Sequence, residues 1–285
     1  MQSRTLLNVV LLLLIAGLVA LVVYEPGIEP PAEPAKLSPL KADDISRIKI
    51  VLKNEAPIIL EKTDTHWWLQ TPVRLRADET TVKHILTLLD ETSFADYPAA
   101  GLDPATTGLN DPPIQLWFND AEIRLGKRNP LQQQRYALSG GRVHMITDKV
   151  SHRLSGDHTR YVARTLLPEN ARIQRLELPD LRLEQVEGKW KVTPEQPQAS
   201  ADDLQILIDH WRRTQAMDVT PYQATEGEGT IRIDLDGETV EFDILETAPE
   251  FILGRKDLAV QYHMLDSALG QLLRLNSSHD TAATP

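Results

Sequence analysis

The longest apolar run of the chain lies between Leu6 and Tyr24. It carries no charged side chain and covers about 19 residues, or ~28 Å in a helix, close to the hydrocarbon thickness of a bilayer. The run is longer than the apolar core of a signal peptide, and no Ala-x-Ala cleavage signal follows it. The pattern therefore predicts an uncleaved transmembrane anchor over residues 6–24 in preference to a cleaved signal peptide.

The charges on either side of this run predict its orientation. Arg4 precedes the run, whereas acidic residues from Glu25 to Glu33 follow it. Basic residues flanking a span favour the cytoplasmic side, so we expect residues 1–5 in the cytoplasm and the remainder in the periplasm, with one pass through the inner membrane. Residues 25–42 are rich in proline, which fixes φ and removes a backbone donor, and are predicted to form a tether.

Beyond the tether the pattern of apolar positions occurs twice. Trp68-Leu69-Gln70-Thr71-Pro72 recurs as Trp190-Lys191-Val192-Thr193-Pro194, each time after two short apolar strands and before an Ala-Asp pair. We expect Asp78 and Asp202 to cap the helices that follow. Each helix has apolar residues at i, i+3, i+4 and i+7, which form one buried face. These residues are Val82, Ile85, Leu86 and Leu89 in the first copy, and Leu204, Leu207, Ile208 and Trp211 in the second.

A hairpin follows each helix, over 114–125 in the first copy and over 231–244 in the second. The turn Asp236-Gly237 between alternating runs is a strong hairpin signal. Each copy then reads β-β-β-α-β-β-β-β-α. The predicted fold class is α+β: an N-terminal transmembrane helix followed by two tandem related repeats, each a mainly antiparallel sheet with packed helices. The predicted boundaries are 43–156 for the first repeat, 157–171 for a connector, 172–275 for the second repeat and 276–285 for a polar tail.

Composition narrows the functional classes. The 285 residues carry a formal net charge of -11, which disfavours binding to nucleic acid because phosphate backbones would be repelled. There is no cysteine, so disulfides, thiolate zinc sites and cysteine nucleophiles are excluded.

No motif in the sequence has the spacing of a known reaction. It contains no phosphate-binding P-loop, no Gly-x-Ser-x-Gly elbow and no His-Glu-x-x-His zinc helix. Two metal alternatives are weak: His152 and His158 lack a nearby third ligand, and adjacent residues in a pair such as His144-Met145 or His263-Met264 point to opposite faces of a strand. We therefore predict no catalytic residue, no cofactor and no metal, and expect that the protein is not an enzyme.

The tryptophans differ in their expected environment. Trp68 and Trp190 are equivalent in the repeats and are expected in the core, as is Trp211 on the apolar helix face. Trp67 would face away from Trp68, and its counterpart in the second copy is Lys189. The sequence therefore predicts that Trp67 could lie on a surface that binds a protein partner, since exposed tryptophan is favoured at interfaces. The alternative is that Trp67 packs beside Trp117 under the first hairpin.

Several of these features together resemble a known family. They are an N-terminal anchor, Trp-x-x-x-Pro followed by Ala-Asp and an amphipathic helix, the step Thr107-Gly108-Leu109-Asn110-Asp111-Pro112, a hairpin ending in Leu125-Gly126, and an aromatic strand near Arg135-Tyr136. This arrangement is similar to the bacterial domain of unknown function 4340 over nearly all of residues 40–275. The resemblance implies a non-enzymatic envelope protein, of a kind often encoded beside ABC-type transport components associated with gliding motility.

Three functional hypotheses remain. The first is a non-catalytic, membrane-anchored periplasmic accessory or scaffold protein of an ABC-transporter-like complex, with an integral membrane protein as partner. The second is a tethered periplasmic binding module that takes a small molecule or an envelope polymer, of unknown identity, in the cleft between the two repeats. The third is a hydrolase whose site is assembled from distant loops.

Overall fold

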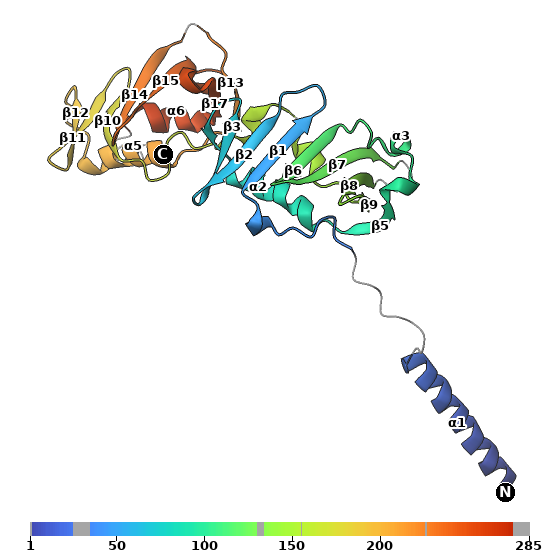
Figure 1. Ribbon diagram of the computed structural model, residues 1–285. Helices are drawn as coiled ribbons and strands as arrows, with labels where there is room; N and C mark the ends of the chain where they lie inside the picture. Colours follow the sequence, from blue (N-terminus) through green and yellow to red (C-terminus); the bar gives the residue numbers. More distant parts are fainter. Residues whose placement is uncertain (1, 25–34, 130–133, 155, 226, 276–285) are drawn as a thin grey trace. The chain divides into compact units, whose positions relative to one another are not determined.

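The computed structural model describes residues 2–24, 35–129, 134–154, 156–225 and 227–275 (Figure 1). The chain divides into two compact units, Met1–Ala35 and Lys36–Pro285. Most of the predicted tether, residues 25–34, and the predicted polar tail, residues 276–285, lie outside the described residues.

The first unit contains the helix α1 (Gln2–Tyr24). A helix that crosses a membrane needs about 20 consecutive apolar residues to match a hydrocarbon core about 30 Å thick. Within the described parts of the chain, no helix meets the requirements of length and apolar character for a membrane span. The N-terminal transmembrane helix in the predicted fold class is therefore wrong.

The second unit is built mostly of antiparallel sheet. In the described residues its 17 strands form one sheet of nine strands and one of eight, and few helices accompany them (Figure 1). The predicted α+β class is wrong in this respect, because the alternating apolar and polar pattern extends over far more of the chain than the helical pattern does. The longest helix of this unit has 13 residues.

The first sheet has the strand order β4-β3-β2-β1-β6-β7-β8-β9-β5. Its strands are β1 (Arg47–Leu52), β2 (Ile58–Thr63), β3 (His66–Thr71), β4 (Leu75–Arg76), β5 (Ser93–Pro98), β6 (Ile114–Phe118), β7 (Ala121–Arg128), β8 (Arg135–Ser139) and β9 (Arg142–Ile146). The helices in this part of the chain are η1 (Ala42–Asp44), α2 (Glu79–Leu86), η2 (Thr87–Asp90), η3 (Ala99–Gly101), α3 (Pro104–Thr107), α4 (Ser151–Leu154) and η4 (His158–Tyr161), where η marks a 3₁₀ helix.

The second sheet has the order β12-β11-β10-β14-β15-β16-β17-β13. Its strands are β10 (Ile173–Glu177), β11 (Arg182–Val186), β12 (Lys189–Thr193), β13 (Asp218–Pro221), β14 (Gly229–Leu235), β15 (Thr239–Glu246), β16 (Phe251–Arg255) and β17 (Val260–Met264). The helices are α5 (Ala201–Arg213), η5 (Lys256–Leu258) and α6 (Asp266–Leu273).

The two sheets have the same arrangement once the two-residue strand β4 is set aside. In both, the three strands before the long helix lie on one side, and the hairpin strands after it continue the sheet. In both, the strand that directly follows the helix, β5 or β13, crosses to the far edge and pairs with the last strand. This crossing adds a fifth strand after each helix, where the sequence predicted four.

The two long helices begin with different caps. Asp78 caps α2 as predicted, since its carboxylate accepts a hydrogen bond of 2.6 Å from the backbone N–H of Thr81. The cap of α5 is Ser200, and the prediction of Asp202 is wrong. Ser200 and Asp203 exchange hydrogen bonds between side chain and backbone, a capping box that places Asp202 inside the first turn.

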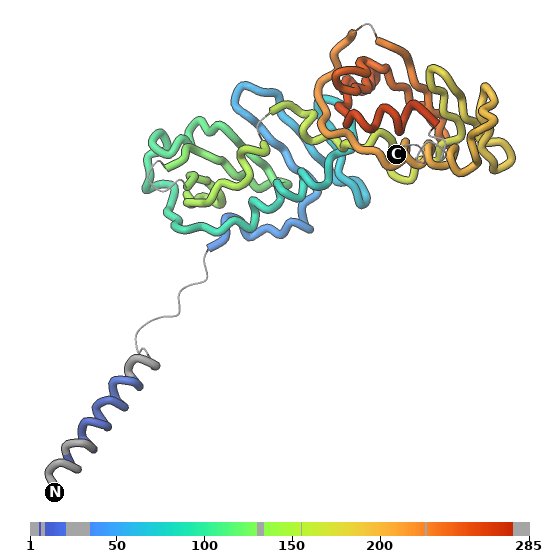
Figure 2. The backbone as a smooth tube through the Cα atoms, turned by 180° about the vertical axis from the view of Figure 1, so that it is seen from behind, coloured from blue at the N-terminus to red at the C-terminus, as the bar shows by residue number. Residues whose placement is uncertain are grey.

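The connector runs between the two sheets (Figure 2) and pairs with the backbone on both sides. Val162 forms a bridge to Ala77 of the first copy, and Thr165 forms one to Gln215 of the second. Tyr161, directly before Val162, is fully buried, and its hydroxyl donates to the carbonyl of Leu154 at 3.2 Å. One continuous apolar core runs through both sheets and the connector. The connector is thus part of the folded unit and positions the copies against each other.

Candidate functional site

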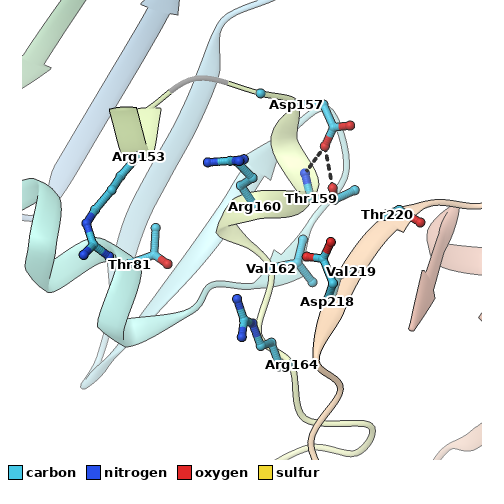
Figure 3. A pocket seen from close by; sticks show the side chains of 11 residues that line it. Thr81, Arg153, Asp157, Thr159, Arg160, Val162, Arg164, Asp218, Val219 and Thr220 are labelled. Atoms are coloured by element: carbon cyan, nitrogen blue, oxygen red, sulfur yellow. Dashed lines mark hydrogen bonds between the residues drawn. The ribbon is translucent and has the colours of Figure 1, made fainter. Parts of the chain in front are cut away.

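A cavity of about 360 Å³ lies where the two copies meet (Figure 3). Three parts of the chain line it: the first turn of α2 at Thr81, the segment 153–164 around η4, and the edge strand β13. We call this cavity the arginine cleft, because Arg153, Arg160 and Arg164 all contribute to its wall.

The three arginines are exposed at the cleft. Within the described residues none of them forms an ion pair. Arginines elsewhere are commonly paired, such as Arg135, which lies 2.7 Å from the carboxylate of Asp148. Figure 3 shows the three arginine side chains around a common space beside Thr81, with the carboxylate of Asp218 on the opposite side.

Gly156 allows the close approach of one of these arginines to the backbone. Its φ of +111° is a conformation that residues with a side chain rarely adopt. A Cβ at this position would also lie 2.7 Å from the Nε and 2.8 Å from the Cδ of Arg160. The turn therefore favours glycine here, and a side chain at this position would displace Arg160.

Two aspartates also line the cleft. The carboxylate of Asp157 accepts hydrogen bonds from the backbone N–H of Thr159, at 2.8 Å, and from the Thr159 hydroxyl, and it caps η4. Asp218 is exposed on the edge strand β13, directly across from His263 of β17. With three cationic and two anionic side chains, one of them held in a cap, the cleft has an excess of positive charge in an acidic protein.

A polar network adjoins the cleft at β13. The His263 Nδ1 lies 3.1 Å from a carboxylate oxygen of Glu250, and the His263 Nε2 lies 2.9 Å from the Thr220 hydroxyl. The Gln261 Oε1 accepts a hydrogen bond from the backbone N–H of Gln223, so its amide nitrogen, 3.3 Å from Nε2, is the donor there. Thr220, His263 and Glu250 thus form one connected polar network beside the cleft.

A second cavity, of about 530 Å³, lies on the first copy between β3, α2 and the connector. Some of its charged groups pair with one another. Arg76 lies 3.2 Å from a carboxylate oxygen of Glu79, and His66 lies 3.7 Å from both Glu79 and Glu169. The second cavity lacks the cationic excess of the arginine cleft, because its lining has more carboxylates than lysines and arginines, with Asp43, Glu79, Asp90 and Glu169 against Lys62, Arg76 and Lys83.

The structure corrects the prediction for Trp67. This residue is only 4% exposed and belongs to the core, whereas Trp68 is partly exposed on the other face. The cause is a β-bulge between β2 and β3: Ile59 pairs with Thr71 but Leu60 pairs with Leu69, which leaves Gln70 as an extra residue. A one-residue shift exchanges the faces of a strand. Trp67 therefore points inward, and the predicted partner surface at this residue is wrong.

The second copy lacks this bulge. Pairing between β11 and β12 is regular, and Trp190 packs partly buried against the core with its indole N–H donating to Gln205 of α5. Trp211 is fully buried, as predicted. The two sequence-equivalent tryptophans, Trp68 and Trp190, thus face opposite sides of their sheets, and Trp68 is not the core residue that was expected.

The remaining candidate residues lie apart from the cleft or are held by structural contacts. In the described part of the chain, no cluster of three His, Asp, Glu or Cys side chains could hold a metal ion. His144 is buried with its Nδ1 3.1 Å from the Ser93 hydroxyl, and burial lowers its pKa. Met145 and Met264 are buried in the sheets. The carboxylate of Asp203 is part of the α5 cap.

The sequence predicted one hypothetical binding site between the two repeats but did not identify the arginines that line it. These arginines lie close together in the chain, between residues 153 and 164, and Gly156 lies shortly before Arg160. That local concentration of positive charge in an acidic chain is a signal that the sequence does contain. The contribution of β13 could not be inferred, since it depends on the crossing of this strand to the edge beside β17.

No protein-family model, curated protein or solved structure shows significant similarity to this chain.

Proposed function

We propose that the protein is a binding module that takes its ligand in the arginine cleft between the two copies. The observation that carries this proposal is a cavity walled by both copies and by the connector that joins them. Its volume of about 360 Å³ falls within the range of small-molecule sites, ~300–1,000 Å³.

The rigid surroundings of the cleft support this function. The backbone N–H of Asp78 donates to the carbonyl of Tyr161 at 2.8 Å, and the N–H of Ala216 donates to the carbonyl of Arg164 at 2.8 Å. These bonds tie the connector to α2 on one side and to the segment before β13 on the other. A site whose walls are fixed before binding loses less conformational entropy when the ligand enters.

A ligand screen on the full chain tests the proposal. We expect the melting temperature to rise with at least one member of a panel of neutral, cationic and anionic small molecules, because a ligand that binds only the folded state stabilises it. Thr81→Trp places a large side chain in the cleft and should abolish the shift. Thr80→Trp, on the exposed neighbouring position of α2, is the matched control and should retain it.

Two results would overturn the proposal. One is a panel that produces no shift at all. The other is a shift that Thr81→Trp and Thr80→Trp reduce equally, since this would place the binding site outside the cleft.

The Thr220–His263–Glu250 arrangement favours a second candidate function, hydrolysis of a carboxylic ester. The Thr220 oxygen would bond to the carbonyl carbon while its proton passes to Nε2 of His263, and the alcohol would leave with that proton. Water would then release the acid and restore the threonine. Turnover of p-nitrophenyl acetate that is lost in Thr220→Val and retained in Thr220→Ser would support this candidate. Equal rates in both variants would eliminate it.

A further inference from the structure

We infer that the ligand of the arginine cleft carries an anionic phosphate or carboxylate group, which Arg153, Arg160 and Arg164 bind. The inference rests on the proposed binding function and specifies the chemistry of its ligand. Its basis is the placement around one cavity of three guanidinium groups that form no ion pair with any described residue.

The distribution of charge in the protein makes this cluster unusual. The chain has 41 acidic and 30 basic residues, so acidic partners for surface arginines are abundant. Arg175, for example, lies 2.8 Å from Glu184 and 3.4 Å from Asp234. The cleft arginines repel one another and have no such compensation among the described residues. Cations that converge on one cavity raise its potential and attract an anion.

Guanidinium groups suit this role for a geometric reason. Each presents several N–H donors in a planar fork that matches the paired oxygens of a carboxylate or phosphate. The hydroxyl of Thr81 lies beside the same space and can donate a further hydrogen bond (Figure 3). A phosphate or carboxylate therefore finds both charge and hydrogen-bond donors in the cleft.

Gly156 leaves room for the side chain of Arg160 beside the backbone. A Cβ at Gly156 would lie 2.7 Å from the Nε of Arg160, so a side chain there would displace the arginine from its position at the cleft.

Asp218 limits which anions bind well. Its carboxylate is exposed on the opposite wall of the cleft and repels a second negative charge. It can instead accept a hydrogen bond from a ligand. The cleft thus fits a ligand with an anionic group at one end and a hydrogen-bond donor at the other.

Isothermal titration calorimetry of the full chain with inorganic phosphate and with acetate tests this inference. We expect saturable binding of at least one anion and a loss of about tenfold in affinity for each of Arg153→Gln, Arg160→Gln and Arg164→Gln, or about 1.4 kcal/mol each. Arg172→Gln is the matched control, because Arg172 is an exposed arginine outside the cleft. Asp218→Asn should strengthen binding. Melting temperatures would verify that the variants fold.

The outcomes separate this inference from the proposed function. If only neutral or cationic members of the ligand panel bind, and Thr81→Trp abolishes that binding, the binding module stands and the anionic class is wrong. If phosphate or acetate binds equally well to the Arg172→Gln control and to the cleft variants, the site lies elsewhere and the inference fails. If nothing in the panel binds, both fail.

Discussion

Among single residues, Asp148 shows how a buried carboxylate is stabilised in this fold. Its side chain is 2% exposed and lies 2.7 Å from Arg135 and 3.1 Å from Arg128. It also accepts hydrogen bonds from the backbone N–H and the hydroxyl of Ser151. Burial alone would raise its pKa, but the hydrogen bonds from Ser151 and Arg135 outweigh it and lower the pKa to about 2.

This pKa predicts how stability depends on pH. Because the pKa is about 2 in the folded state and 3.8 in its ordinary range, the carboxylate stabilises the fold above pH ~4. That contribution, about 2 kcal/mol, is lost as the pH falls from ~4 to ~2. Urea unfolding at several pH values checks the prediction. Asp148→Asn should remove this part of the dependence, whereas Asp120→Asn, on an exposed turn, should leave it unchanged.

Gly156 provides a prediction that links a single residue to the cleft. Gly156→Ala should displace Arg160 and weaken phosphate binding severalfold, in addition to a cost in stability from the positive φ. Gly237→Ala is the control, since Gly237 has a φ of +94° but no atom near the position of a Cβ. Titration calorimetry and melting curves of both variants separate the two effects. Loss of affinity in both variants, or in neither, would contradict the proposed role of Gly156.

At the scale of elements, the bulge at Gln70 determines which tryptophan enters the core. Trp67 is buried against the core, whereas Trp68 lies on the outer face with the guanidinium of Arg74 4.7 Å from its ring. Removing a buried aromatic side chain leaves a cavity and costs about 3–5 kcal/mol. An exposed cation–π contact contributes only about 0.5–1 kcal/mol.

We therefore expect Trp67→Ala to lower the free energy of unfolding by about 3–5 kcal/mol. Trp68→Ala should lower it by about 1 kcal/mol. Denaturant titration followed by circular dichroism measures both values. The opposite ranking would mean that the bulge is absent in solution and that β3 pairs in the regular register seen for β12.

The elements also show how far the sequence predicts this fold. Period-two alternation correctly predicted hairpins such as β14 and β15, because their pairing partners are adjacent in the chain. The bulge at Gln70 was not predictable, since no glycine or proline marks it. The edge strands β5 and β13 were also missed. Their partners β9 and β17 lie far along the chain, so no adjacent run of residues signals the pairing.

At the scale of the whole molecule, the two copies share one core through the connector. Tyr161, Leu166 and Leu167 of the connector are buried in that core. Unfolding of either copy would expose these side chains and break the bridges of Val162 and Thr165. The second unit is therefore expected to unfold as one cooperative body.

Calorimetry of the full chain tests this cooperativity. We expect a single transition for the two sheets, with equal calorimetric and van't Hoff enthalpies. Tyr161→Ala removes the fully buried side chain at the junction and should lower stability by about 3–5 kcal/mol. Two separate transitions in the unmodified protein would show that the copies are thermodynamically independent.

The cleft is formed only at the scale of the whole molecule, so the sequence predicted a binding cleft between the repeats as one hypothesis but not the residues that line it. Thr81, Arg160 and Asp218 come from α2, the connector and β13, and only the docking of the two copies brings them together. The resemblance to the bacterial domain of unknown function 4340, the accessory role beside a transporter and the periplasmic location at the inner membrane stay predictions.

Hydrogen exchange of the full chain, with and without saturating inorganic phosphate, is the most direct test of binding in the arginine cleft. We predict slower exchange of backbone amides in two segments, 156–164 and 218–220, because these segments form the walls of the cleft. Arg160→Gln should require about tenfold more phosphate for the same protection. Protection that appears only around His66 and Glu79 at the second cavity, or no protection at a concentration that saturates binding, would contradict the assignment.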